Sequence, residues 1–166
     1  MSLRTVLTNG TVVTGYAKLK DCALYIDEKG EIGDIFNMRR LSEKQFPSDT
    51  TMIDVGGSYI MPGFIDSHIH GIGGFGTEDC KASSILGMSE RLADFGVSAF
   101  MPTVYTDKLD MMKASTKAIA EAMGSEQGAK IMGINLEGPF ISMERVGAQN
   151  PEGVIPVRLE IFNDLI

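Results

Sequence analysis

The two histidines of this 166-residue chain stand two positions apart, as His68 and His70, with Asp66 two positions before them. Successive side chains of a β-strand point to opposite faces, so residues two apart share one face. Imidazole binds Zn²⁺, Fe²⁺ and similar ions, and a carboxylate such as that of Asp66 can hold a ligand in one tautomer. The spacing therefore predicts a metal site, and the simpler alternative is a pair of polar residues at a strand end.

Glu137 is a third candidate ligand. It ends a short apolar run and is followed at once by Gly138 and Pro139, so a strand must end there. In a barrel of parallel strands the carboxyl ends face one mouth, which can bring Glu137 to His68 and His70. Two imidazoles and one carboxylate form a catalytic zinc-type ligand set with one open position. Without the histidine pair, Glu137 would be interpreted as an exposed loop carboxylate.

The elements that must position these residues begin near Tyr59, where apolar runs start to alternate with amphipathic segments. This alternation predicts parallel β/α units rather than hairpins. We expect strands within 59–70, 97–103 and 130–136, helices near 83–95 and 109–123, and the start of a third helix within 157–166.

The first 56 residues have a different pattern, that of short strands joined by turn residues. The dipeptide Asn9-Gly10 predicts a hairpin turn, residues 27–30 predict another, and residues 37–50 predict a solvated loop or short helix. We therefore expect an α/β protein with two regions, a small β segment over residues 1–56 and β/α units over residues 57–166.

The segment Gly71–Gly76 matches the pattern GxGxxG, which occurs in dinucleotide-binding proteins. That pattern should open a helix at once, whereas helical periodicity resumes here only after Lys81. The glycines are better explained as a tight turn beside the histidines.

Composition and charge narrow the class of protein. Fifteen Lys and Arg against twenty-two Asp and Glu give a net charge of −7, so nucleic acid is not an expected partner. No apolar run approaches the ~20 residues of a membrane helix, so we expect no membrane association. Cys22 and Cys80 form no metal-type spacing, and the first residues show no signal pattern. A cytoplasmic location fits best.

Three segments resemble known motifs. Met61–Gly71 contains Pro-Gly-Phe-Ile-Asp-Ser-His-Ile-His-Gly, which resembles the PGFID-x-H-x-H-G signature of the amidohydrolase superfamily. Asn135–Ile141 and Gly147–Pro151 resemble the LEGPF and GA[HQ]-x-P segments of the N-acetylglucosamine-6-phosphate deacetylase family within it. The resemblance implies the N-terminal part of a (β/α)₈ barrel behind a small β-sandwich segment. It also implies hydrolysis of the acetamide of N-acetylglucosamine 6-phosphate.

The same resemblance implies roles for individual residues. Glu137 becomes a ligand of one divalent ion, while His68 and His70 become ligands of a second, sometimes unoccupied, position. Ala148 and Gln149 fall where the family contacts the phosphorylated amino-sugar substrate. The ions are Zn²⁺, Fe²⁺ or similar, one or two in number, and the family is commonly homo-oligomeric.

The family places further histidine ligands and a catalytic Asp on later strands, but no His follows His70 in this sequence. A (β/α)₈ barrel needs ~250 residues, and about three of its eight units are expected here. We therefore assign no catalytic residue, and expect the chain to be an incomplete fragment, inactive alone and prone to association through the missing barrel half. Another amidohydrolase, such as a cyclic amidohydrolase, and a non-catalytic interaction module remain as alternatives.

Overall fold

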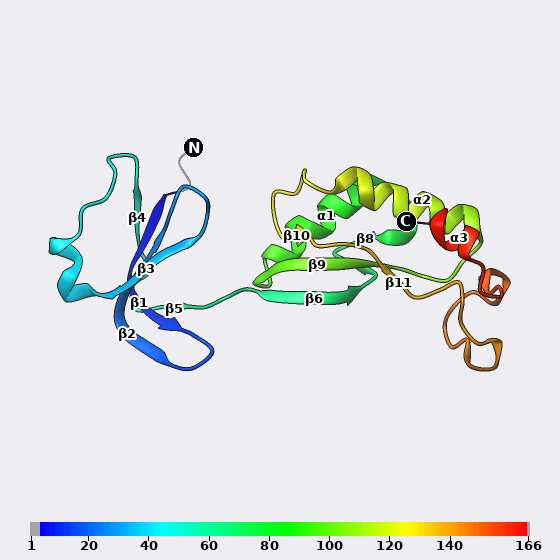
Figure 1. Ribbon diagram of the computed structural model, residues 1–166, viewed down its shortest axis with the longest axis horizontal. Coiled ribbons are helices and arrows are strands. Elements are labelled where there is room, and N and C mark those ends of the chain that lie inside the picture. Colours follow the sequence, from blue (N-terminus) through cyan, green and yellow to red (C-terminus); the bar gives the residue numbers. More distant parts are fainter. Residues whose placement is uncertain (1–3, 166) are drawn as a thin grey trace. The chain divides into compact units, whose positions relative to one another are not determined.

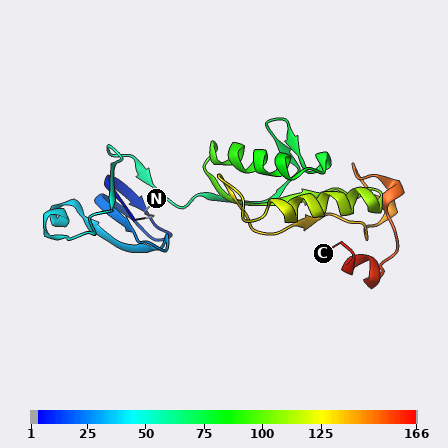
Figure 2. The same ribbon diagram turned by 90° about the horizontal axis from the view of Figure 1, so that it is seen from above.

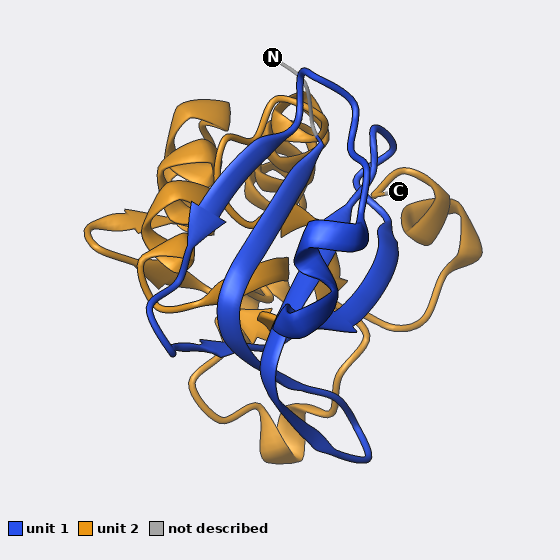
Figure 3. Ribbon diagram, turned by 90° about the vertical axis from the view of Figure 1, so that its left-hand side faces the viewer, with its two compact units in different colours: residues 1–62 blue, residues 63–166 orange. Residues whose placement is uncertain are grey.

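The computed structural model describes residues 4–165, and the chain divides into two compact units, residues 1–62 and 63–166 (Figures 1 and 3). Each unit contains its own β-sheet. After β4 (Thr51–Asp54), a turn with positive φ at Gly56 and Gly57 returns the chain to the first sheet as β5 (Tyr59–Ile60). The pairing of β5 with β1 thus keeps the residues up to 62 in unit 1.

Unit 1 is built on a five-stranded mixed sheet in which β1 (Thr5–Val13) is central. β2 (Lys18–Ile26) pairs antiparallel with β1, and β3 (Ile32–Asn37) pairs antiparallel with β2. β4 and β5 pair parallel with successive halves of β1. The buried apolar residues form two clusters, Val6, Ala23 and Phe36 in one and Val12, Cys22 and Leu24 in the other.

The hairpin predicted at Asn9-Gly10 is wrong, because β1 continues through both residues. Asn9 has a φ of 55°, and the pairing with β2 shifts register between Leu7 and Gly10, which marks a β-bulge. A Cβ on Gly10 would lie 2.4 Å from Ile60 Cδ1, so a larger residue would require the Ile60 side chain of β5 to move. The residue types that favour a turn serve here to bend one strand.

Unit 2 contains a parallel sheet centred on β9 (Val97–Val104). β6 (Phe64–Ile69) pairs with one side of β9, while β10 (Lys130–Ile131) and β11 (Asn135–Leu136) pair in succession with the other. The strand predicted over 130–136 is therefore two short strands, interrupted at residues 132–134. Parallel pairing gives all these strands the same direction, so their carboxyl ends lie at one edge.

Two helices cover one face of this sheet, α1 (Ala82–Ala93) and α2 (Leu109–Ala122), and they lie side by side (Figures 1 and 2). Both confirm the predicted helices to within a few residues. Their buried residues recur at helical spacing and pack against the sheet. The core of unit 2 contains Ile85, Met88, Leu92, Phe100, Val104, Met112, Ile119, Ala122, Ala129, Ile131 and Leu165.

The glycine-rich segment forms a small antiparallel hairpin of β7 (Gly71–Ile72) and β8 (Phe75–Gly76). Gly73 and Gly74 form its turn with φ of 64° and 88°. A 3₁₀ turn, η2 (Thr77–Asp79), separates the hairpin from α1. The glycines therefore do not open a helix, as a dinucleotide site would require.

Short elements complete the two units. Unit 1 contains the 3₁₀ helix η1 (Met38–Glu43), within the segment predicted as a loop or short helix. Unit 2 contains η3 (Met143–Arg145), η4 (Pro151–Gly153) and α3 (Leu159–Asn163). No helix within residues 4–165 has the length and apolar character needed to span a bilayer.

Candidate metal centre

Three side chains meet at the carboxyl ends of the parallel strands. His68 lies near the end of β6, His70 follows β6 directly, and Glu137 follows β11. His68 Nε2 lies 3.2 Å from Glu137 Oε1, and His70 Nε2 lies 3.3 Å from Glu137 Oε2. One ligand atom from each of the three residues lies within 4.8 Å of the others. The structure thus brings together the three predicted ligands.

Glycine is required directly after Glu137. A Cβ on Gly138 would lie 1.9 Å from Thr106 Oγ1, closer than non-bonded atoms approach. The close packing of Gly138 on Thr106 holds the backbone next to Glu137 against the segment that follows β9. This contact gives a physical reason for the Glu-Gly-Pro order in the sequence.

The ring of His70 is held by two partners from β9 and its end. Its Nδ1 lies 3.0 Å from the carbonyl oxygen of Thr103, and Tyr105 stacks on the imidazole at 3.6 Å between centroids with 9° between planes. A carbonyl oxygen only accepts hydrogen bonds, so His70 Nδ1 carries a hydrogen. In the neutral ring, Nε2 then points a lone pair towards Glu137.

A lone pair that faces a carboxylate oxygen at 3.3 Å is unfavourable unless a positive species lies between them. Two ligand atoms at about 2.1 Å from a tetrahedral Zn²⁺ are separated by about 3.4 Å. The nitrogen-to-oxygen distances of 3.2 and 3.3 Å are close to this value. The donor set of His70, His68 and Glu137 therefore fits a divalent ion.

His68 differs from His70 in the partner of its Nδ1. Asn135 Nδ2 lies 3.2 Å from the carbonyl oxygen of Ser67 and 3.1 Å from His68 Nδ1. In this orientation the amide donates to His68 Nδ1, so Nε2 of a neutral ring carries the hydrogen and donates to Glu137. For His68 Nε2 to bind an ion, Asn135 must instead present its oxygen to Nδ1. Asn135 thus controls the role of His68.

Gln149 joins the site through Glu137. Its Nε2 donates to Glu137 Oε2 at 2.5 Å, and its Oε1 accepts from the backbone N–H of Thr106 at 2.7 Å. The neighbouring Ala148 is exposed, in the loop before η4. The side chain predicted to contact substrate is therefore also in contact with a candidate metal ligand.

Asp66 does not have the predicted role as an acceptor for an imidazole. Its Oδ1 accepts from the backbone N–H of His68 at 3.0 Å and so fixes the backbone at the end of β6. The tautomer partners are the Thr103 carbonyl and Asn135. The sequence contains no signal for a backbone carbonyl that accepts from a histidine. The contact of Tyr105 with His70 was not predicted either, because aromatic residues at strand ends are common in cores.

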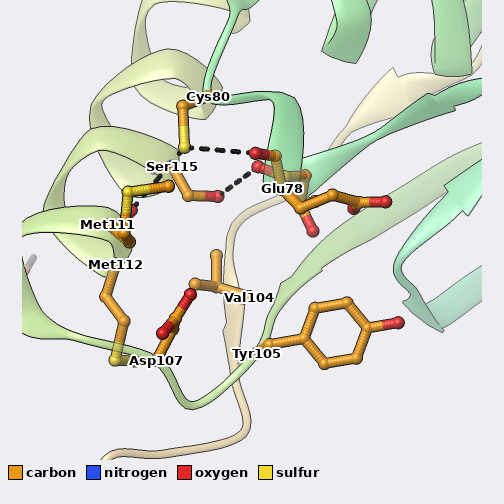
Figure 4. Close-up of a pocket in the computed structure, with 9 residues that line it drawn as sticks. Glu78, Cys80, Val104, Tyr105, Asp107, Met111, Met112 and Ser115 are labelled. Carbon is orange, nitrogen blue, oxygen red and sulfur yellow. Dashed lines mark hydrogen bonds between the residues drawn. The ribbon is translucent and has the colours of Figure 1, made fainter. Parts of the chain in front are cut away.

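Three cavities adjoin this region, one of which, of about 240 Å³, is lined by Glu137 and the residues that follow it. An open recess of about 590 Å³ is lined by His70, Tyr105, Glu78, Asp79 and the hairpin residues 71–76. A much smaller cavity of about 30 Å³ lies beside Cys80 and Ser115, and the ring of Tyr105 extends away from it (Figure 4).

The groups at the small cavity are bonded within the protein. Ser115 Oγ donates to the carbonyl oxygen of Thr77 at 2.8 Å. Burial, followed by the nearby carboxylates, raises the pKa of the Cys80 thiol, so thiolate is disfavoured. Burial likewise raises the pKa of Tyr105, whose phenol stays protonated beside His70. The larger recess gives access to His70, whereas the His68 side chain is itself 53% exposed.

A parallel β/α sheet with two histidines and a carboxylate at its strand ends is an arrangement found in metal-dependent hydrolases. Residues 59–164 match the model of the Amidohydrolase family, and the chain belongs to this family. This match confirms the superfamily resemblance of the Met61–Gly71 motif.

The curated relatives are N-acetylglucosamine-6-phosphate deacetylases. The protein from Bacillus subtilis is 32% identical over 165 residues, which cover 95% of this chain and 38% of the relative. The protein from Bos taurus is 32% identical over 168 residues, with 96% and 38% covered. The chain thus spans about two fifths of the length of these relatives.

Several solved structures of similar fold carry the same name. The crystal structure of the deacetylase from Pasteurella multocida aligns with a TM-score of 0.82 at 24% identity, covering 98% of this chain and 41% of that one. The enzyme from Mycobacterium smegmatis aligns with a TM-score of 0.75 at 22% identity, covering 97% and 43%. At these identities the structural likeness supports the mixed α/β fold.

Proposed function

We propose that this chain contributes the first ligand-bearing strands of a metal-dependent deacetylase. The reaction is hydrolysis of the acetamide of N-acetylglucosamine 6-phosphate to glucosamine 6-phosphate and acetate, a step of amino-sugar catabolism. The observation that carries the proposal is the convergence of His68, His70 and Glu137 at 3.2–3.3 Å in a chain of the amidohydrolase family. The names of the curated relatives supply the substrate.

A bound divalent ion supplies Lewis-acid activation of water and of the amide carbonyl. The residues of this chain hold and orient that ion. His70 offers an Nε2 lone pair fixed by Thr103, and Glu137 supplies negative charge. His68 joins as a ligand once Asn135 accepts from its Nδ1.

The substrate enters, in this proposal, through the recess beside His70 and Tyr105. Ala148 and Gln149 contact the phosphorylated amino sugar from the loop before η4. An amide nitrogen has two hydrogens, and the bond to Glu137 uses one of those on Gln149 Nε2. The second hydrogen can serve a substrate oxygen.

Finer features are part of the same proposal. Unit 2, which begins at residue 63, forms the N-terminal part of a (β/α)₈ barrel, and unit 1 forms part of a β-sandwich. The ions are Zn²⁺ or Fe²⁺, one or two in number, and the whole enzyme is a cytoplasmic homo-oligomer.

A chimera tests the function. The 166 residues replace the matched segment of the Bacillus subtilis relative, and acetate release from N-acetylglucosamine 6-phosphate is measured with purified, Zn²⁺-loaded protein. We expect turnover by the chimera and its loss in the same chimera with Glu137→Gln. A dihydropyrimidine, the substrate type of a cyclic amidohydrolase, and unphosphorylated N-acetylglucosamine serve as comparison substrates.

Two outcomes would contradict the proposal. A well-folded chimera that hydrolyses the dihydropyrimidine but not the sugar phosphate would assign the chain to another amidohydrolase activity. A folded chimera that binds Zn²⁺ and hydrolyses neither substrate would favour a non-catalytic module.

A further inference from the structure

Gln149 stands between the backbone after β9 and the carboxylate of Glu137. The N–H of Thr106 can only donate, so the amide end that accepts from it at 2.7 Å must be Oε1. The other end, Nε2, then faces Glu137 Oε2 at 2.5 Å. The orientation of the amide is thus set by the backbone rather than by Glu137.

The loop that carries Gln149 is itself attached to the same backbone segment. The N–H of Asn150 donates to the carbonyl oxygen of Thr106 at 3.1 Å, and Asn150 Nδ2 donates to Asp107 Oδ1 at 2.6 Å. The Asn150 oxygen also accepts from the N–H of Glu152, the second residue of η4. Gln149 therefore approaches Glu137 from a fixed position.

We propose that Gln149 is a positioning residue that holds the Glu137 carboxylate towards the two imidazoles and thereby sets the affinity of the site for a divalent ion. Glu137 has several rotatable bonds, and its side chain is 24% exposed, so it can adopt other rotamers. A charge-assisted hydrogen bond to Oε2 selects the rotamer that faces His68 and His70. This role is distinct from a contact with substrate, because it acts before any substrate binds.

The inference rests on the proposed metal site, and one experiment separates the two. The Zn²⁺ affinity of the 166-residue chain is measured without substrate, by competition with a chromophoric chelator. Gln149→Met keeps the length and volume of the side chain but removes both hydrogen bonds. The matched control is Gln127→Met, since Gln127 is exposed in the loop after α2.

We expect Gln149→Met to weaken Zn²⁺ binding by about 10- to 100-fold, the range seen when a residue that orients a ligand is lost. Gln127→Met should bind as the parent chain does. Far-ultraviolet circular dichroism and thermal melting report whether each variant is folded. If Gln149→Met does not fold, Gln149→Asn replaces it, because the shorter amide cannot span from Thr106 to Glu137 yet keeps the loop polar.

The possible results are distinguishable. Folded variants at position 149 that bind Zn²⁺ as tightly as the parent would overturn the positioning role and leave the metal site intact. A parent chain that binds no Zn²⁺ would overturn the metal site and, with it, the role of Gln149. Weakened binding in Gln127→Met as well would show a general loss of affinity and would also contradict the proposal.

Discussion

The candidate site of unit 2 and the surfaces of both units satisfy their carboxylates in different ways. In unit 1, Asp49 and Glu28 pair with Arg4, at 2.8 and 3.2 Å, and Asp34 pairs with Lys44. In unit 2, Asp164 pairs with Lys113 in the same way, but Glu137 faces two imidazoles, and the neutral ring of His70 directs a lone pair at it because its other nitrogen donates to Thr103. Lysine or arginine completes the surface carboxylates, whereas Glu137 lies with two histidines in a group that could hold a metal ion. Ion pairs with lysine or arginine stabilise the surface, whereas the Glu137 carboxylate lies among groups that can bind a ligand.

The largest expected effect tests whether the two units are independent in stability. Met88 is fully buried in the core of unit 2, and Met88→Ala should lower the free energy of unfolding of that unit by about 2–5 kcal/mol. Hydrogen exchange resolved by residue should show faster exchange within unit 2 and unchanged protection in unit 1. Met132→Ala, at a residue 55% exposed, is the matched control and should change little. Equal loss of protection in both units would show one cooperative fold.

The next prediction concerns the negative charge of Glu137. Glu137→Gln keeps the shape of the side chain but removes its charge, and should weaken Zn²⁺ binding at least about 100-fold, or about 2.7 kcal/mol. Isothermal titration calorimetry measures the affinity, with Glu144→Gln in the exposed η3 as the control. Tight Zn²⁺ binding by folded Glu137→Gln would place the ion elsewhere.

A smaller effect should follow at Asn135. An Asp at this position can only accept from His68 Nδ1, which leaves Nε2 free to bind an ion. Asn135→Asp also loses the hydrogen bond to the Ser67 carbonyl oxygen, so it should tighten Zn²⁺ binding by less than about tenfold, while ¹⁵N chemical shifts of His68 should change to those of the Nδ1–H tautomer. Weaker binding, or an unchanged tautomer, would contradict the role given to Asn135.

The smallest effect is expected in unit 1 and depends on pH. The hydrogen bond from Lys44 lowers the pKa of Asp34, so this stabilisation is present above the unfolded pKa of about 3.9 and is lost as the pH falls through the lowered folded value. Solvent screens the pair, since Asp34 is 43% exposed, and Asp34→Asn should cost less than about 1 kcal/mol at pH 7. Urea unfolding at pH 7 and at pH 2 should show this cost only at pH 7. Zn²⁺ affinity should be unchanged.

Much of unit 2 follows from sequence periodicity. The helices at 83–95 and 109–123 and the strand at 97–103 were predictable because apolar residues recur at the spacing of each element. The meeting of Glu137 with the histidine pair was predictable because parallel strands end at one edge. Metal binding and substrate contact by these residues stay predictions.

Other features could not be predicted, for reasons that differ between residues. Asn9-Gly10 favours a positive φ, which serves a hairpin and a bulge equally well, and the choice depends on the later strand β5. Gln149 reaches Glu137 from an irregular loop, where no periodicity places a side chain. The Thr103 carbonyl is a main-chain group, so no residue type in the sequence indicates its contact with His70. Pattern therefore predicts elements better than the contacts that refine a site.

The hydrogen-bond partners of His68 and His70 differ in whether a mutation can change them. The partner of His70 is a main-chain carbonyl, which every amino acid possesses, so substitution at Thr103 changes the side chain but leaves that acceptor in place. The partner of His68 is a side chain, and a single-nucleotide change converts an Asn codon to an Asp codon. The acceptor for His70 is thus preserved under substitution, while the partner of His68 can change from an amide to a carboxylate in a single mutation.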